Sequence, residues 1–222
     1  MNYGVIVFPG SNCDSDCFHA IRDEIKADIQ YIWHEESSLP SKLDVLIIPG
    51  GFSYGDYLRC GAIAKFAKIM PEIVRFANGG GYVIGICNGF QILTESGLLP
   101  GALLRNQFQK FICKDIFLKV TNTESSFTRD FQKQQVITVP IAHGEGRYFI
   151  DKQGLQSLED NGQIAFQYVS KSGDLTSEDN PNGSLKSIAG IFNKNKNVLG
   201  MMPHPERCNF VNRESLKILK IS

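Results

Sequence analysis

The feature that most constrains the fold is a set of short apolar runs, each of which ends at a turn and is followed by a helical pattern. The runs are Tyr3–Phe8, Leu43–Ile48 and Tyr82–Cys87. Short apolar runs bounded by glycine or proline are typical of strands that are buried on both faces. Because these strands alternate with helices, they predict βαβ units and a mostly parallel central sheet with helices on both faces.

The same patterns predict the remaining elements. Helices are expected from the Pro9-Gly10 turn to about Ala27, over 61–78 with a break at Pro71, and over 88–95. No internal repeat or low-complexity linker interrupts the chain, so residues 1–222 are predicted to form one α/β domain. The other expected elements are strands over 28–33, 111–121, 136–142, 163–169, 187–192 and 198–202, and a closing helix over 207–220.

Charge and composition exclude several classes of function. The chain has 23 basic and 23 acidic side chains, a balance that argues against general binding to nucleic acid or to a membrane surface. No apolar stretch is long enough to span a membrane, and the N-terminus lacks the features of a secretory signal. A cytoplasmic location with reduced cysteines is therefore expected. The six cysteines form no CxxC pair, so no metal site is predicted.

Cys87 is the cysteine that the sequence marks as reactive. It lies in Gly85-Ile-Cys-Asn-Gly89, between a strand and a helix, where small residues allow the sharp turn that exposes a nucleophile. The helix N-terminus favours the thiolate and can bind an oxyanion. On local sequence alone, an inert cysteine fits equally well. A phosphate-binding loop is disfavoured, because the sequence has neither a Walker A nor a GxGxxG pattern here. The other cysteines are expected to be small buried hydrophobes: Cys13, Cys17, Cys60, Cys113 and Cys208.

A base and an orienting carboxylate for this thiol stand together in His204-Pro-Glu206. The segment follows the strand over 198–202, and strand ends of a parallel sheet meet at one edge, so it can reach Cys87. In an extended segment, His204 and Glu206 would project to the same side. An arbitrary HxE motif is more often part of a solvated turn. Here a catalytic role is favoured, because Cys87 also lies on a turn at the end of a strand of the predicted sheet. His143 begins another glycine-rich turn after a strand.

These motifs together resemble those of the triad-type (class I) glutamine amidotransferases, which pair a GxCxGxQ turn with a distant HxE. Longer strings are similar to the glutaminase subunits of phosphoribosylformylglycinamidine synthases. The resemblance covers nearly the whole chain and implies a flavodoxin-like fold and the fourth step of purine synthesis. That step converts formylglycinamide ribonucleotide to its amidine with ATP and glutamine-derived ammonia. The strings are Pro49-Gly-Gly-Phe-Ser-Tyr-Gly-Asp56, His143-Gly-Glu-Gly-Arg-Tyr148, and residues 97–101, 180–184 and 200–207.

The resemblance implies a role for each matching residue. Cys87 would attack the glutamine carboxamide and form a glutamyl thioester, while His204 acts as general base and then acid and Glu206 orients the imidazole. It assigns no role to Arg207. Backbone N–H groups would form an oxyanion hole, and further residues would hold the backbone of the glutamine. The oxyanion set is Gly51 or Phe52, with Asn88, and the glutamine-binding set is Gln91, His143 and Gly144.

The resemblance also implies partners. The sequence contains no recognisable ATP site, and its length is that of one glutaminase domain. A separate synthase subunit that uses ATP and Mg is therefore expected, together with a small accessory subunit. No cofactor is expected on this chain, and ammonia would pass to the synthase inside the complex.

Several alternatives stay open. Another amidotransferase, a stand-alone glutaminase or a γ-glutamyl hydrolase would use the same triad, although the PGGFSYGD and HGEGRY strings argue against them. Related small stress and deglycase proteins usually carry histidine directly after the turn cysteine, where this chain has Asn88. A non-catalytic scaffold partner is disfavoured by the intact triad. The phenylalanine-rich segment 108–117 could face a partner, but a core position is expected for most of the phenylalanines.

Overall fold

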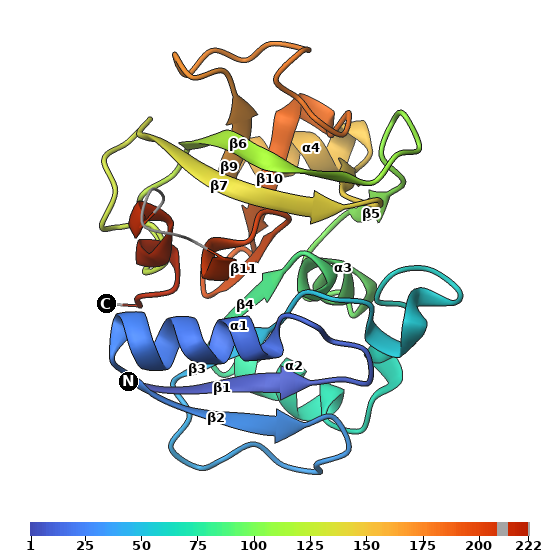
Figure 1. Ribbon diagram of the computed structural model, residues 1–222, viewed down its shortest axis with the longest axis vertical. Helices are drawn as coiled ribbons and strands as arrows, with labels where there is room; N and C mark the ends of the chain where they lie inside the picture. The colour runs from blue at the N-terminus through green and yellow to red at the C-terminus, as the bar shows by residue number, and fades with distance from the viewer. Residues whose placement is uncertain (208–212, 222) are drawn as a thin grey trace.

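The computed structural model describes residues 1–207 and 213–221 and places a nine-stranded sheet through the whole molecule (Figure 1). The strand order is β2-β1-β3-β4-β11-β10-β9-β6-β7. The first five strands are parallel: β1 (Asn2–Val7), β2 (Asp28–Trp33), β3 (Val45–Ile48), β4 (Tyr82–Ile86) and β11 (Val198–Met201). Antiparallel pairings add β10 (Ile188–Phe192), β9 (Ile164–Val169), β6 (Ile112–Val120) and β7 (Val136–His143).

Helices cover both faces of the parallel half, with α1 in front of the strands and α2 behind them (Figure 1). The helices are α1 (Asp14–His19), which continues as a π-helix over Ala20–Ile25, α2 (Met70–Asn78), α3 (Asn88–Glu95) and α4 (Lys152–Asp160). A small second sheet joins β5 (Ala102–Leu104) to β8 (Arg147–Phe149). The expected α/β class is confirmed. Within the described ranges, none of the helices has the length and hydropathy needed to cross a membrane.

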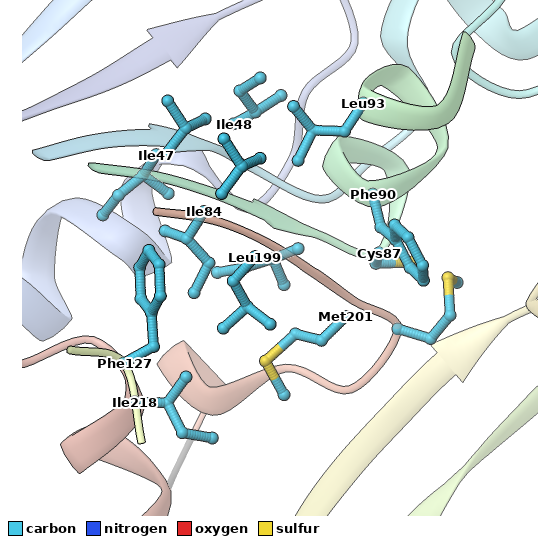
Figure 2. Packing of buried hydrophobic residues seen from close by; sticks show 14 of the residues in the cluster. Ile47, Ile48, Ile84, Cys87, Phe90, Leu93, Phe127, Leu199, Met201 and Ile218 are labelled. Carbon is cyan, nitrogen blue, oxygen red and sulfur yellow. The ribbon is translucent and has the colours of Figure 1, made fainter. Parts of the chain in front are cut away.

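The inner parallel strands β3, β4 and β11 are buried because aliphatic side chains occupy both of their faces, whereas β2, at the edge of the sheet, is largely exposed. Figure 2 shows Ile47, Ile84 and Leu199, from three neighbouring strands, packed into one cluster. Each fully buried aliphatic side chain of this kind contributes about 1.5–3 kcal/mol to folding. Cys87 stands at the edge of the cluster beside Phe90 (Figure 2). The residue at the end of β4 is therefore held by a rigid core.

Most predicted elements are confirmed, with boundaries that shift by one or two residues. The helix expected over 61–78 is wrong for 61–69, where Gly61 has φ 79° and the chain forms turns and one short 3-10 helix, Ala64–Phe66. The helix over 88–95 and the strand over 28–33 are found at the expected residues. Pro71 lies in the first turn of α2, where a missing N–H costs nothing, and so it begins this helix. Sequence patterns missed β5, β8 and α4. The first two have only three residues each, and α4 is mostly polar, although the capping side chain of Asp151 marks its start.

The closing helix expected over 207–220 is wrong for the described residues. Two separate 3-10 helices occupy this region, Pro205–Arg207 and Arg213–Ile218. Ser215 and Ile218 are both buried, and a spacing of three residues places both on one face of a 3-10 helix. Residues 208–212 lie outside the described residues. The burial expected for Cys208 falls on this segment and stays a prediction.

Tyr3 ties the first strand to the C-terminal segment. Its buried hydroxyl donates to the carbonyl of Leu219 at 2.9 Å and accepts from the N–H of Ile221 at 3.2 Å. Tyr3→Phe keeps the ring but leaves both backbone groups without this partner. We expect the free energy of unfolding to fall by about 1–3 kcal/mol, measured by urea denaturation.

The matched control for this variant is Tyr57→Phe, because the Tyr57 side chain is 87% exposed. Its free energy of unfolding should stay within about 0.5 kcal/mol of the unmodified protein. Equal stability of both variants would contradict a structural role for the Tyr3 hydroxyl.

Candidate active site

The pairing of β4 with β11 brings the two sequence motifs together. These strands are parallel, with Gly85 opposite Gly200 and Ile86 opposite Met201. The N–H of Cys87 then donates to the carbonyl of Met201 at 2.8 Å. Both strands end at the same edge of the sheet, so Cys87 and the segment that begins at Met202 leave the sheet side by side.

Cys87 occupies a strained turn. Its backbone has φ 50° and ψ −104°, and it is the N-cap residue of α3. An L-residue with this conformation costs about 1–3 kcal/mol. A Cβ atom on Gly85 would lie 2.6 Å from the carbonyl oxygen of Gly89, and one on Gly89 would collide with the carbonyl of Ile48. The two glycines therefore allow the close backbone approach that the turn requires, as the sequence predicted.

His204 and Glu206 form a buried pair. His204 Nδ1 lies 2.7 Å from Glu206 Oε1, and both side chains are almost fully buried. The extended geometry expected for this segment is wrong, because Pro205–Arg207 forms a 3-10 turn. The 3-10 turn places the Glu206 carboxylate against the His204 imidazole, so the expected contact between them forms without an extended backbone. The carboxylate fixes the hydrogen on Nδ1, which leaves Nε2 to act on the thiol.

The charge of Glu206 controls His204. Burial lowers the pKa of the imidazole, whereas the Glu206 carboxylate and the Cys87 thiol raise it, and the net shift is well upward. A Cβ atom on Gly50 would lie 2.9 Å from His204 Cε1 and 3.4 Å from Cys87 Cβ. The imidazole and the thiol side chain therefore meet against Gly50, where His204 can accept and stabilise a proton from Cys87.

A cavity of about 270 Å³ opens onto this pair. Its size suits a small-molecule ligand. It contains every residue of the predicted glutamine-binding set, and it places them beside Cys87 and His204. The lining residues used below are Cys13, Gly51, Phe52, Cys87, Gln91, Phe111, His143, Gly144, His204 and Arg207.

Two backbone N–H groups beside the thiol are free to bind an oxyanion. Within residues 1–207 and 213–221, no acceptor binds the N–H of Gly51 or of Asn88. Asn88 is the first residue of α3, whose N-terminal N–H groups have no partner within the helix. The N–H of Phe52, the other expected donor, already donates to the carbonyl of Gly10 at 2.9 Å. The expectation for Phe52 is therefore corrected, and Gly51 is the donor left by this loop.

The glutamine-binding set lies on two elements of the cavity wall. Gln91, on α3, donates from Nε2 to the carbonyl of Glu145 at 2.6 Å and accepts from Asn88 Nδ2 at 2.9 Å. His143 ends β7, and Gly144 begins the turn that follows. The Gln91 contact ties α3 to this turn and so holds the two walls of the cavity together.

Cys13 is part of the site, although the sequence gave no signal for it. It is buried, and its Sγ accepts from Arg207 Nη2 at 2.9 Å. Arg207 also pairs with Asp16 at 3.4 Å. Its guanidinium therefore links the start of α1 to the turn that carries the triad histidine. Cys17 is buried as expected, Cys60 is half-buried, and Cys113 is exposed, so its expected burial is wrong.

Cys13, His204 and Glu206 also have the atom types of metal ligands, and their donor atoms lie within 4.8 Å of one another. However, His204 Nδ1 already bonds Glu206, and the cationic guanidinium of Arg207 bonds Cys13. A divalent cation would meet that positive charge. The arrangement therefore fits a proton-transfer pair better than a metal centre.

A thiol on a strained turn, a buried histidine–carboxylate pair and free backbone donors are the groups that a cysteine-nucleophile enzyme of the acyl-transfer class requires. Comparison with known proteins narrows this class. Residues 2–217 match the model of the CobB/CobQ-like glutamine amidotransferase domain, and the chain belongs to this family.

Two closer relatives were found. The chain is 55% identical to phosphoribosylformylglycinamidine synthase subunit PurQ of Alkaliphilus metalliredigens over 209 residues, which are 94% of this chain and 88% of that protein. A chain in the structure of PurLQS from Thermotoga maritima is 42% identical, with a TM-score of 0.84 over 98% of this chain and 95% of that chain. A putative GMP synthase subunit from Thermoplasma acidophilum shares only the fold, at 16% identity and a TM-score of 0.63 over 99% and 90% of the two chains.

Gly50→Ala tests how closely the thiol and the imidazole must approach. The new methyl group would press on His204 Cε1 and on Cys13 Sγ, at 2.9 Å and 3.1 Å. We expect kcat/KM for glutamine to fall at least about tenfold, since small displacements of reacting groups are costly.

The control for Gly50→Ala is Gly79→Ala, at the end of α2, where φ is −78° and the nearest atom is the Arg75 carbonyl oxygen at 3.3 Å. It should leave kcat/KM unchanged. Full activity of Gly50→Ala would mean that the thiol and imidazole do not meet as described.

Glu206→Gln tests the charge of the pair. The amide can still accept from His204 Nδ1, but the pKa of His204 should fall because burial then dominates. We expect kcat to fall about 10²- to 10⁴-fold, as in related triads.

A raised histidine pKa stabilises the fold below the unfolded value of about 6.5, and this contribution is lost as the pH rises through the folded pKa.

Urea denaturation across pH checks that sign. The loss of stability in Glu206→Gln should therefore have its full value below about pH 6.5, and should shrink as the pH rises through the folded pKa of His204. A loss that is independent of pH would contradict the electrostatic role of the carboxylate.

Proposed function

We infer that this chain is the glutaminase subunit of phosphoribosylformylglycinamidine synthase. It hydrolyses glutamine to glutamate and ammonia, and the ammonia serves the conversion of formylglycinamide ribonucleotide to formylglycinamidine ribonucleotide in purine biosynthesis. The observation that carries the chemistry is that the strained Cys87 and His204 line one cavity, with the buried Glu206 carboxylate bonded to His204 Nδ1. The relative that is 55% identical over 94% of the chain supports the assignment to this synthase.

The geometry supports a thioester mechanism. His204 Nε2 accepts the proton of the Cys87 thiol, and Sγ attacks the carboxamide carbon of glutamine. The N–H groups of Gly51 and Asn88 stabilise the oxyanion of the tetrahedral intermediate. His204 then protonates the leaving nitrogen, so ammonia departs and a glutamyl thioester remains. Water gives a proton to His204, attacks the thioester and releases glutamate, and the proton returns to the thiolate.

Glu206 remains ionised in this scheme. Its carboxylate stabilises the imidazolium that forms on His204 in each half of the reaction. Gln91, His143 and Gly144 then hold the α-amino and α-carboxyl end of glutamine, a proposal supported by their place in the cavity wall.

Exposed apolar side chains support a partner at the mouth of the cavity. Phe52 and Phe111 line the cavity yet are 51% and 58% exposed. Tyr57, Leu58 and Phe108, on the same two loops, are also exposed, although a core position was expected for most phenylalanines. Apolar side chains grouped in this way are typical of protein interfaces. We propose that the synthase subunit docks here and receives the ammonia.

The remaining partners follow the assembly of the relative. The Thermotoga maritima structure is named PurLQS, which supports a synthase subunit and a small accessory subunit for this chain as well. ATP and Mg are assigned to the synthase subunit, because the sequence contains no recognisable ATP site. A cytoplasmic location stays a prediction.

Cys87→Ser in the reconstituted complex tests the function. Serine lacks the nucleophilicity of a thiolate, so we expect glutamine-dependent amidine formation to fall by at least about 10³-fold. Ammonia-dependent formation should be unchanged because the synthase step does not use Cys87. Glutamate release and amidine formation are the two measurements, made with and without the partners.

The outcomes separate the alternatives. Strong glutamate release by the lone chain, indifferent to partners, would indicate a stand-alone glutaminase or γ-glutamyl hydrolase. Normal glutamine use by Cys87→Ser would remove the nucleophile assignment. No release in either setting would indicate a scaffold.

A further inference from the structure

Asn106 is a buried residue of the loop between β5 and β6, and its hydrogen bonds fix the orientation of its amide. Nδ2 donates to the carbonyls of Lys110 and His143, both at 2.9 Å. Oδ1 accepts from the N–H of Gly146 at 3.0 Å. A reversed amide would place its oxygen against two carbonyls and its NH₂ against an N–H. The amide oxygen therefore stays where it is.

This orientation determines which nitrogen of His143 carries the hydrogen. Asn106 Oδ1 lies 3.1 Å from His143 Nδ1, and an amide oxygen can only accept. Nδ1 must therefore be protonated. Burial and the neighbouring His204 lower the pKa of His143 to about 4, so the ring is neutral near pH 7. Its Nε2 is then an unprotonated acceptor.

The acceptor has no partner within the chain. His143 is 3% exposed, and its buried Nε2 has no hydrogen bond to any of the described residues. A buried polar atom without a partner costs free energy, and such atoms are retained where a ligand satisfies them. His143 lines the same cavity as Cys87. The atom that lacks a partner is an acceptor, so the group it lacks is a hydrogen-bond donor. In zwitterionic glutamine, every such donor is an N–H group.

We propose that Asn106 is a positioning residue that sets the tautomer of His143, so that its Nε2 accepts a hydrogen bond from an N–H group of the substrate glutamine. This proposal rests on the proposed function. It gives the side chain of His143 a defined role as an acceptor, opposite in sense to the proton-carrying role of His204. It also explains why a loop outside the triad motifs should matter for catalysis.

Two substitutions of His143 separate the acceptor role from a structural one. A glutamine side chain at position 143 can place its amide oxygen near the former position of Nε2, whereas an asparagine side chain there ends near the former position of Nδ1. If the acceptor matters, His143→Gln should keep KM for glutamine within about threefold, and His143→Asn should raise it about tenfold, the effect of one lost hydrogen bond. If only the contact with Asn106 matters, His143→Asn should be the better variant.

Asn106→Ala tests the positioning step itself. We expect KM for glutamine to rise about tenfold, with kcat changed less and ammonia-dependent synthesis unchanged in the complex. The matched control is Asn122→Ala, because Asn122 also braces a loop, through Gly162 and Glu124, but lies outside the cavity wall. It should leave KM unchanged.

Imidazole nitrogen NMR on ¹⁵N-histidine-labelled protein reads the tautomer directly and needs no variant. We expect protonated Nδ1 and unprotonated Nε2 for His143 near pH 7, and a shift of the Nε2 resonance when L-glutamine binds to the Cys87→Ser protein. Asn106→Ala should give a mixture of tautomers.

A hydrogen on Nε2 in the unmodified protein would overturn the proposal. So would an unchanged KM in both Asn106→Ala and His143→Asn. If Cys87→Ser still blocks glutamine use in either case, the proposed function stands and only the role of Asn106 fails.

Discussion

The parallel pairing of β4 with β11 is the contact on which the active site depends. It places Gly85 opposite Gly200 and lets both strands end together. A Cβ atom on Gly200 would collide with the ring of Phe90 and would lie 2.5 Å from Leu99 Cδ1, so the absence of side chains lets α3 pack directly on these strands. That packing aims the N-terminus of α3, and hence its free N–H groups, at the point where the triad segment leaves β11.

The strain at Cys87 is stable because the surrounding core allows no alternative. Figure 2 shows Cys87 and Phe90 against the cluster that contains Ile84 and Met201. Relaxing the φ of 50° would move β4 or α3, and each is fixed by buried side chains. The core therefore supplies the preorganisation that an exposed thiol on a flexible loop would lack. Glu206 is likewise almost fully buried, against His204.

The sequence predicted those parts of the site that depend on local geometry. The turn around Cys87 needs glycine at 85 and 89, and this requirement is visible in the chain itself. Phe52 could not be judged in the same way, because its N–H is used by Gly10, a contact between two loops. Cys113 was expected to be buried, but residues 113–115 of β6 are exposed on both faces of the sheet, in the part of the strand that pairs with β7 and not with β9. Asn106 and Cys13 join the site only through tertiary contacts, which no spacing in the sequence records.

Two histidines line one cavity, and their hydrogen-bond partners shift their pKa values in opposite directions. Glu206 supplies a negative charge, so the pKa of His204 rises despite burial. Asn106 supplies only a neutral acceptor, so burial and the charge of His204 lower the pKa of His143 to about 4. Two imidazolium ions in this cavity would repel each other. In the proposed mechanism, a neutral His143 would therefore let His204 carry the proton during thioester formation. The amide at 106 and the carboxylate at 206 would in this way separate an acceptor from an acid–base group.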